Sequence, residues 1–543
     1  MKVTMPRVVV LLVALCGQLA CAGGELAGDA QADRSDADAG APGGELDAGG
    51  VDAAEDAQGF PDADADADGD EAEVECRGDD DCVGVGVRCC EDVCVESASC
   101  AFSVTAVEPT TGWLSGGDWL TLTGAGFVEG MRVYIGEGRA PVRILDSAHA
   151  TVLTPPGLAG VADVTVVWPG EQAATRHGAF SYAPGGLAPS WETISVLYDA
   201  APRGRTPGVA VLRDGRALVA GGTARPSDFH SGQRSADLFG PPATRAVVHV
   251  ANEMGAGRCW NGAVTMLTGK ALVVGGCWNS ISGGDVSDTA DLFDPETNLF
   301  APTSTPMNAA RGGLMLATLL VDGRVLIASG DTASLEIYDP DTDSFELVPH
   351  GTLHDGGFLV RLRDGRVLLG GGGMNTALPG YARAYAEVFD SDSGEWTSVG
   401  GMAQPTFWTT AVALPDGRAL VIGGAVNGNP MTYTSHIEIF DPVTDTFSLA
   451  PYSLSAARAG ASSAVLLRDG TVLAIGRDGG SAAVDQIDPV NGTVTPYPSA
   501  PARNSGIEFS AARLLDGSVL VAGGFDADDD DCSDFYELVP AAP

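Results

Sequence analysis

Basic residues are scarce in this chain of 543 residues: 30 Lys and Arg stand against 72 Asp and Glu, for a net charge of −42. Proteins that bind nucleic acids neutralise phosphates with Lys and Arg, and anionic membrane surfaces attract the same side chains. The charge balance therefore argues against both kinds of partner. Long segments with helical periodicity are also missing. With 73 Gly, the composition favours an all-β fold with many tight turns.

The first 20 residues have the pattern of an export signal. A positively charged start precedes an apolar stretch at 8–15, which is too short to span a bilayer. Cys21 ends a sequence that resembles a bacterial lipobox, although Gln18 stands where Leu is usual. Residues 20–22 also fit an A-x-A cleavage site, so free secretion stays open. We expect an exported lipoprotein of the outer membrane or cell surface, otherwise a secreted protein, which meets a membrane only through a lipid anchor.

An acidic tether is expected over residues 21–75. This segment is rich in Asp, Ala, Gly and Glu, and it has too little apolar surface to offset the entropy of ordering. Residues 64–75 match an EF-hand calcium loop literally. However, an alternating Asp-Ala run produces such matches by chance, and no amphipathic helix flanks them. We interpret the segment as a solvated linker.

Cysteines are concentrated in residues 76–100. Such density in an exported chain predicts a small disulfide-rich module, and six cysteines allow 15 pairings among which the sequence does not choose. A metal cluster is the alternative, although no His is nearby. The six residues are Cys76, Cys82, Cys89, Cys90, Cys94 and Cys100.

Two further cysteines, Cys259 and Cys277, flank an expected hairpin with its turn at Thr268-Gly269. They are equidistant from the turn, so they should face each other on adjacent strands, close enough for a disulfide. Two buried thiols are the alternative. Cys532 is then left over, either unpaired or in another pairing.

Residues 101–183 alternate in the manner of strands and carry Gly/Pro turns. The motifs Leu120–Gly124, Thr154–Gly157 and Gly178–Tyr182 resemble those of the IPT/TIG domain. The resemblance implies an immunoglobulin-like β-sandwich that acts as a spacer or a protein-contact module. The segment contains no catalytic constellation.

A repeat of about 50 residues occupies the rest of the chain. Residues 213–222 recur at 321–330, each with an apolar strand, an Asp-Gly turn and a second apolar strand. Four strands per copy would form one propeller blade. The Asp-Gly turn returns at 364, 416, 469 and 516, with Thr268-Gly269 as a degenerate copy.

These repeats resemble the kelch and galactose-oxidase-like β-propellers, over residues 188–543. The last copy stops after its third strand, at 534–538, and residues 191–194 look like the missing fourth strand. Joining the two ends in one blade would hide both sheet edges. The expected fold is therefore all-β: a seven-bladed propeller, an N-terminal immunoglobulin-like sandwich and a small disulfide-rich module.

An Arg precedes the first strand of five blades, which would gather guanidinium groups near one end of the propeller axis. Such a ring could hold a carboxylate of a ligand. Trp408 and His354 stand at similar positions and would suit a protein or glycan partner if they are exposed. Buried packing of these rings is the alternative. In the alternative interpretation, each Arg fixes its blade by bonding neighbouring carbonyls. The Arg candidates are Arg205, Arg258, Arg311, Arg458 and Arg503.

Catalysis is the competing hypothesis, because the resemblance includes carbohydrate-modifying enzymes. Galactose oxidase holds copper with Tyr and His, but this chain has only 7 His and no Tyr-His pair. His350 and His354 share a loop, yet their spacing is typical of metal ligands only on a helix, which is not expected there. A sialic-acid-epimerase-like enzyme would use Arg and Glu, but no general acid or base stands out.

No cofactor is therefore expected, apart from calcium at an acidic loop over residues 526–534, which is otherwise a solvated loop. The leading hypothesis is a non-catalytic propeller that binds a protein or a glycan.

Overall fold

All regular secondary structure in the described part of the chain is β, as expected. None of these segments is a helix long and apolar enough to cross a membrane. The predictions for Cys21, the signal peptide, the tether and the acidic loop at 526–534 fall outside the described residues. The computed structural model describes residues 87–90, 93–96, 102–185, 187–194, 206–223, 232–240, 244–277, 286–328, 332–348, 350, 352, 354–373, 382–426, 432–478, 481–497, 509–524 and 535–540.

A short hairpin stands in the predicted disulfide-rich module. Strands β1 (Val87–Cys90) and β2 (Val93–Glu96) are antiparallel, and Cys89 lies opposite Cys94. Cys76, Cys82 and Cys100 lie outside the described residues, so the pairing of the six cysteines stays a prediction.

Two sheets form the sandwich that follows. Alternate residues of each strand enter the core, as Leu120 and Leu122 do on β5, because successive side chains on a strand point to opposite faces. Phe180 and Tyr182 close the core from β11, and the Tyr182 hydroxyl donates to Pro155 O at 2.9 Å. The sheet orders are β3-β5-β9-β8 and β4-β11-β10-β6-β7. The strands are β3 (Ser103–Glu108), β4 (Thr111–Trp113), β5 (Trp119–Ala125), β6 (Arg132–Ile135), β7 (Gly138–Ala140), β8 (Val142–Ile144), β9 (His149–Leu153), β10 (Gly160–Val167) and β11 (Ala173–Ala183).

Seven four-stranded antiparallel sheets follow among the described residues from 187 onward, and we call them blades 1 to 7. A separate two-stranded sheet pairs β31 (Ala425–Val426) with β32 (Thr432–Tyr433). Blade 1 contains β13 (Gly208–Val211), β14 (Ala217–Ala220), β15 (Ala236–Phe239) and β16 (Val247–His249). Blade 2 contains β17 (Gly262–Thr265), β18 (Ala271–Val274), β19 (Ala290–Asp294) and β20 (Leu299–Pro302). Blade 3 contains β21 (Leu316–Leu319), β22 (Val325–Ala328), β23 (Leu335–Asp339) and β24 (Ser344–Val348). Blade 4 contains β25 (Gly357–Arg361), β26 (Val367–Gly371), β27 (Ala386–Asp390) and β28 (Glu395–Ser398). Blade 5 contains β29 (Thr410–Ala413), β30 (Ala419–Ile422), β33 (Ile437–Asp441) and β34 (Thr446–Leu449). Blade 6 contains β35 (Ala459–Leu466), β36 (Val472–Asp478), β37 (Ser481–Asp488) and β38 (Thr493–Pro496). Blade 7 contains β39 (Phe509–Arg513), β40 (Val519–Gly523), β41 (Phe535–Pro540) and the earlier strand β12 (Leu187–Ile194).

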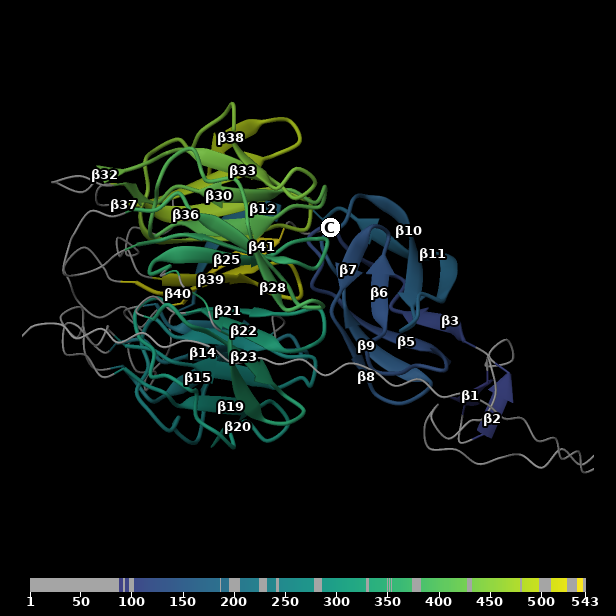
Figure 1. Ribbon diagram of the computed structural model, residues 1–543. Helices are drawn as coiled ribbons and strands as arrows, with labels where there is room; N and C mark the ends of the chain where they lie inside the picture. The colour runs from purple at the N-terminus through teal and green to yellow at the C-terminus, as the bar shows by residue number, and fades with distance from the viewer. Residues whose placement is uncertain are drawn as a thin grey trace, which may run out of the picture. The chain divides into compact units, whose positions relative to one another are not determined.

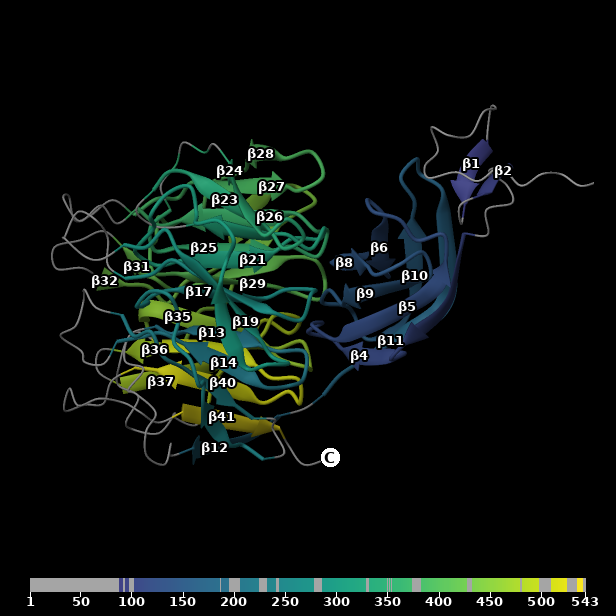
Figure 2. The same cartoon turned by 90° about the horizontal axis from the view of Figure 1, so that it is seen from below.

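The blades close into a ring. The first strands β13, β17, β21, β25, β29, β35 and β39 are neighbours in that order, and β39 returns to β13. β12 pairs antiparallel with β41, with Trp191 opposite Leu538 and Ile194 opposite Phe535. The two strands lie side by side in Figures 1 and 2. As the sequence predicts, a strand from before the first repeat completes the last blade.

Each blade begins with the same hairpin, whose chemistry explains the recurring Asp-Gly. In blade 1, Asp214 Oδ1 accepts the Arg216 N–H at 3.0 Å, and Gly215 adopts a φ of +86° that disfavours other residues. The second strands are buried throughout, as in β14 and β18, because each is covered by blades on both sides. This explains their near-continuous apolar sequence.

Candidate ligand-binding site

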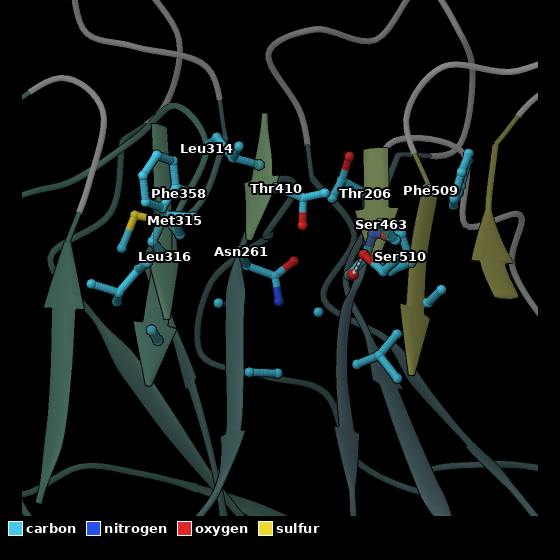
Figure 3. A pocket seen from close by; sticks show the side chains of 18 of the residues that line it. Thr206, Asn261, Leu314, Met315, Leu316, Phe358, Thr410, Ser463, Phe509 and Ser510 are labelled. Atoms are coloured by element: carbon cyan, nitrogen blue, oxygen red, sulfur yellow. Dashed lines mark hydrogen bonds between the residues drawn. The ribbon is translucent and has the colours of Figure 1, made fainter. Parts of the chain in front are cut away.

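A pocket of about 270 Å³ lies on the axis of the propeller, lined by the first strands of several blades. Figure 3 shows Asn261, Ser463 and Ser510 directed into it, with Phe358 and Phe509 on opposite sides. The remaining lining is dominated by Gly, Ala and Thr, whose small side chains leave space at the axis.

The chemistry of this pocket is uncharged. Its lining contains the polar side chains of Thr206, Asn261, Thr410, Ser463 and Ser510, and none of its described residues is Asp, Glu, His, Lys or Arg. Ser510 Oγ already donates to Pro207 O at 2.7 Å. The buried Thr206 Oγ1 has no hydrogen-bond partner among the described residues. The pocket thus offers neutral hydrogen bonds beside apolar surface.

The structure corrects the prediction that Arg258 and Arg311 bind a ligand. Both are 0% exposed. Arg258 Nη2 lies 2.6 Å from Asp291 Oδ2, and Arg311 Nη2 lies 2.8 Å from Glu336 Oε1. Burial lowers the pKa of Arg258, and Asp291 opposes this effect.

Neighbouring oxygens occupy the remaining donors of both Arg side chains. Arg258 Nη1 donates to Gly275 O and Thr289 O, each at 2.9 Å, and Arg311 Nη1 donates to Ser334 O at 2.5 Å. No donor is left for a carboxylate of a ligand. The alternative interpretation, an Arg that braces its own blade, agrees with this geometry.

Arg458 repeats the arrangement in blade 6. It is 0% exposed, bonds Asp485 through Nη2 and donates from Nη1 to Ala483 O. It is therefore corrected in the same way. Arg205 and Arg503 lie outside the described residues, and their ligand-binding role stays a prediction.

Trp408 and His354 have different environments. Trp408 is half-buried; its backbone N–H donates to Gly356 O at 2.5 Å, and its ring packs edge-on against Phe407. Residues 409 and 410, which follow it, line the axial pocket. His354 is 3% exposed, and burial lowers its pKa to about 4. A buried imidazole cannot meet a large ligand directly, so the prediction that His354 contacts a protein or glycan is corrected.

His354 instead belongs to a buried cluster in blade 4 that we did not predict. His350 and His354 come together with Glu387 of β27, and their potential ligand atoms all lie within 4.8 Å of one another. Tyr385 OH donates to Glu387 Oε1, and His350 Nε2 bonds Glu387 Oε2. The sequence signal for this cluster is the His-x3-His spacing, which is typical of metal ligands on a helix, whereas these two residues lie outside any helix.

The two cysteines of blade 2 do face each other. The pairing of β17 with β18 has the predicted register, and the two Sγ atoms lie 2.8 Å apart, with the Cys259 thiol donating to Cys277. That hydrogen bond is the main reason why the pKa of Cys277 is lowered. The structure contains the pair as thiols, and the disulfide stays a prediction.

The four-stranded sheets form a ring, and six of the seven start with an Asp-Gly hairpin, while blade 2 has Thr268-Gly269 instead. This is the architecture of a kelch-type β-propeller, here preceded by a β-sandwich. The sandwich matches the model of the IPT/TIG domain over residues 103–182, as the sequence predicts.

Comparisons with known proteins fit the propeller architecture. The chain is similar to Kelch-like protein 21 of Rattus norvegicus, with 27% identity over 127 residues, which is 22% of this chain and 20% of the relative. With the Homo sapiens protein of the same name the identity is 25% over 153 residues, 28% of this chain and 22% of the relative. The chain thus spans about a fifth of the length of these curated relatives.

Two solved structures also match at low identity. The structure of YjhT has a TM-score of 0.41 and 13% identity, covering 56% of this chain and all of the other. A fungal alcohol oxidase of the AA5 family in complex with copper has a TM-score of 0.41 and 16% identity, covering 78% of this chain and 93% of the other.

Proposed function

We propose that this chain is an exported protein whose seven-bladed propeller binds a partner protein without catalysis, at the axial pocket. The observation that carries the proposal is the uncharged lining of that pocket. Hydroxyl and amide groups of Asn261, Thr410 and Ser463 stand beside the rings of Phe358 and Phe509. Such groups suit an extended peptide, whose main chain needs hydrogen bonds and whose side chains need apolar contact.

Two further points support this proposal over an enzyme. The described lining contains no general acid or base and no set of metal-ligating side chains. The similarity to kelch-repeat proteins supports a protein partner in general terms. A glycan would use the same hydroxyl and aromatic groups and is the second candidate. A carbohydrate-modifying enzyme is the third.

The test fills the pocket. Thr410→Trp places a large ring at the axis, whereas Val443→Trp places the same ring on a turn where Val443 is 90% exposed. Both full-length variants and the parent are expressed in the native cell, and partners are captured by crosslinking from the cell envelope. We expect Thr410→Trp to lose a protein partner that the parent and Val443→Trp retain.

The other outcomes are distinct. Equal capture by all three proteins contradicts the pocket as the binding site. Pocket-dependent binding to a glycan array, without a protein partner, replaces the protein by a glycan. Turnover of galactosides or sialic acids by the parent, with or without added copper, contradicts the non-catalytic proposal.

We also propose lipid anchoring through Cys21, which rests on the lipobox-like sequence and the acidic segment after it. In the native cell, Cys21→Ala should release the protein from the membrane fraction. A variant that fractionates with membranes as the parent does would exclude the anchor and leave the binding proposal intact.

A further inference from the structure

His354 stands in the position of the buried Arg residues. Arg258 directly precedes Cys259, whose carbonyl accepts the Cys277 N–H at 2.6 Å, and His354 directly precedes Asp355, whose carbonyl accepts the Gly373 N–H at 2.9 Å. Two residues later, Trp260 and Gly356 share a positive φ, of 52° and 68°. These backbone matches make His354 the counterpart in blade 4 of Arg258 in blade 2.

His350 replaces an apolar residue. The position four residues before the Arg is Met254 in blade 2, Met307 in blade 3 and Leu454 in blade 6, all buried. In blade 4 it is His350, whose side chain is 4% exposed. Blade 4 therefore has His at both of these positions of the repeat, and both imidazoles lie beside Glu387 of the third strand.

Glu387 has no Arg partner, unlike its counterparts in blades 2, 3 and 6. Asp291, Glu336 and Asp485 each bond the Arg of their own blade. Glu387 is 7% exposed and is contacted by His350 and Tyr385 instead. Desolvating a buried carboxylate costs free energy, and a positive partner offsets part of that cost.

The imidazole of His354 is set up as a ligand. Its Nδ1 lies 3.0 Å from Gly371 O, and because a carbonyl can only accept, Nδ1 carries the proton. Nε2 is then a buried lone pair, and it has no hydrogen-bond partner among the described residues. Metal-bound His side chains commonly donate their other N–H to a backbone carbonyl in this way.

We propose that blade 4 binds a zinc ion through His350, His354 and Glu387, at the place where a guanidinium meets the carboxylate in blades 2, 3 and 6. Two imidazoles and one carboxylate form an established ligand set for zinc, and three protein ligands leave one position open. The Tyr385 hydroxyl, bonded to the other oxygen of Glu387, would orient that ligand. The dication replaces the charge that the Arg supplies elsewhere.

Zinc binding by the full-length protein tests this proposal. The protein is first depleted of metal with a chelator and then titrated with Zn²⁺, with Co²⁺ as a spectroscopic probe of tetrahedral nitrogen and oxygen ligation. We expect one equivalent to bind and to raise the thermal unfolding midpoint. His354→Gln should weaken this binding by about 100-fold or more, since even residues behind the ligands commonly contribute 10- to 100-fold. The control is His249→Gln, because His249 is an exposed residue of blade 1 paired with Asp237, and it should bind zinc as the parent does.

A second variant distinguishes loss of the zinc site from misfolding. His350→Met combined with His354→Arg installs the residues of blade 2, so it should fold with an Arg–Glu387 pair and lose the zinc equivalent. Parent-like affinity in this variant or in His354→Gln would overturn the proposal. Absence of the equivalent in the parent would also overturn it, and would leave His350 and Tyr385 as the hydrogen-bond partners of Glu387.

Discussion

Blades 3 and 4 both bury a carboxylate on the third strand, but different residues lie beside it. In blade 3, Arg311 and Glu336 are both fully buried and bonded to each other. In blade 4, His354 and Glu387 occupy the same positions, and His350 adds a second imidazole. The repeat thus preserves a buried carboxylate on the third strand and varies the group that compensates it.

The buried carboxylate on the third strand is present in several blades for a structural reason. Beyond the Arg, the carboxylate accepts backbone N–H groups from the segment that enters the blade: Glu336 accepts from Asn308 at 2.7 Å, and Asp291 accepts from Gly255 at 2.9 Å. Glu438 of blade 5 does the same for Ala403 at 2.8 Å, with Thr406 in the Arg position. The acid therefore fixes the entering chain in several blades, and the cation position is free to change.

The largest effect should come from breaking the Arg–Glu pair of blade 3. Arg311→Met leaves Glu336 buried without its cation, and we expect a loss of about 3–5 kcal/mol in the free energy of unfolding, because removing one partner of a buried pair exposes the desolvation cost of the other. Denaturant unfolding of the full-length protein measures it. Arg324→Met is the matched control in the same blade, because Arg324 and Asp322 are each 31% exposed and such pairs contribute about 0–1 kcal/mol.

A double variant sharpens the result. Arg311→Met with Glu336→Leu removes both charges and should recover most of the loss, because hydrophobic replacement of a complete buried pair is often neutral. If Arg311→Met is no more destabilising than Arg324→Met, the buried pair does not support the blade.

The sequence predicts the architecture well because its signals are local and repeated. An Asp-Gly turn specifies a hairpin within a few residues, and β12 could be assigned to the last blade because the final copy lacks a fourth strand. The register around Thr268 also follows from the hairpin itself, which is why the meeting of Cys259 and Cys277 was predictable.

The roles of the polar residues could not be predicted in the same way. Arg258, Arg311 and Arg458 find their carboxylates 33, 25 and 27 residues away, across a loop of variable length. Sequence alone places each Arg at a blade end, but whether it faces solvent or a third strand depends on that distant pairing. The His pair shows the same limit, since the third member of its cluster, Glu387, is 37 residues from His350.

The next effect concerns blade 2, where Cys259 and Cys277 stand at the positions of Asp355 and Gly373 in blade 4. If the pair is oxidised in the native compartment, it closes a loop of 18 residues and should stabilise the protein by roughly 3 kcal/mol in the chain-entropy model. Peptide mapping without reduction should recover the two peptides joined. Recovery of both cysteines separately alkylated would refute the bridge. Cys259→Ala is the control, because reductant should then no longer lower the stability of blade 2.

The smallest effect concerns a hydroxyl that blade 3 has and blade 4 lacks. Tyr338 OH donates to Asp343 Oδ1 at 2.7 Å, whereas blade 4 has Phe389 and Gly394 at these positions. Tyr338→Phe should lower the free energy of unfolding by about 1 kcal/mol, the usual net value of a hydrogen bond or slightly more for one to a charged group.

Burial works to raise the pKa of Asp343, but hydrogen bonds from Ser304 and Tyr338 outweigh it and hold that pKa below 3.8. A carboxyl whose pKa is lowered by folding stabilises the protein above its unfolded pKa, and this stabilisation is lost as the pH falls through the folded value. The difference between parent and Tyr338→Phe should therefore be full at pH 6 and shrink below about pH 4. A double-mutant cycle with Asp343→Asn, measured by denaturant unfolding at both pH values, isolates the pair. A coupling that is the same at both pH values would show that the hydroxyl stabilises blade 3 by packing and not through the charged carboxylate.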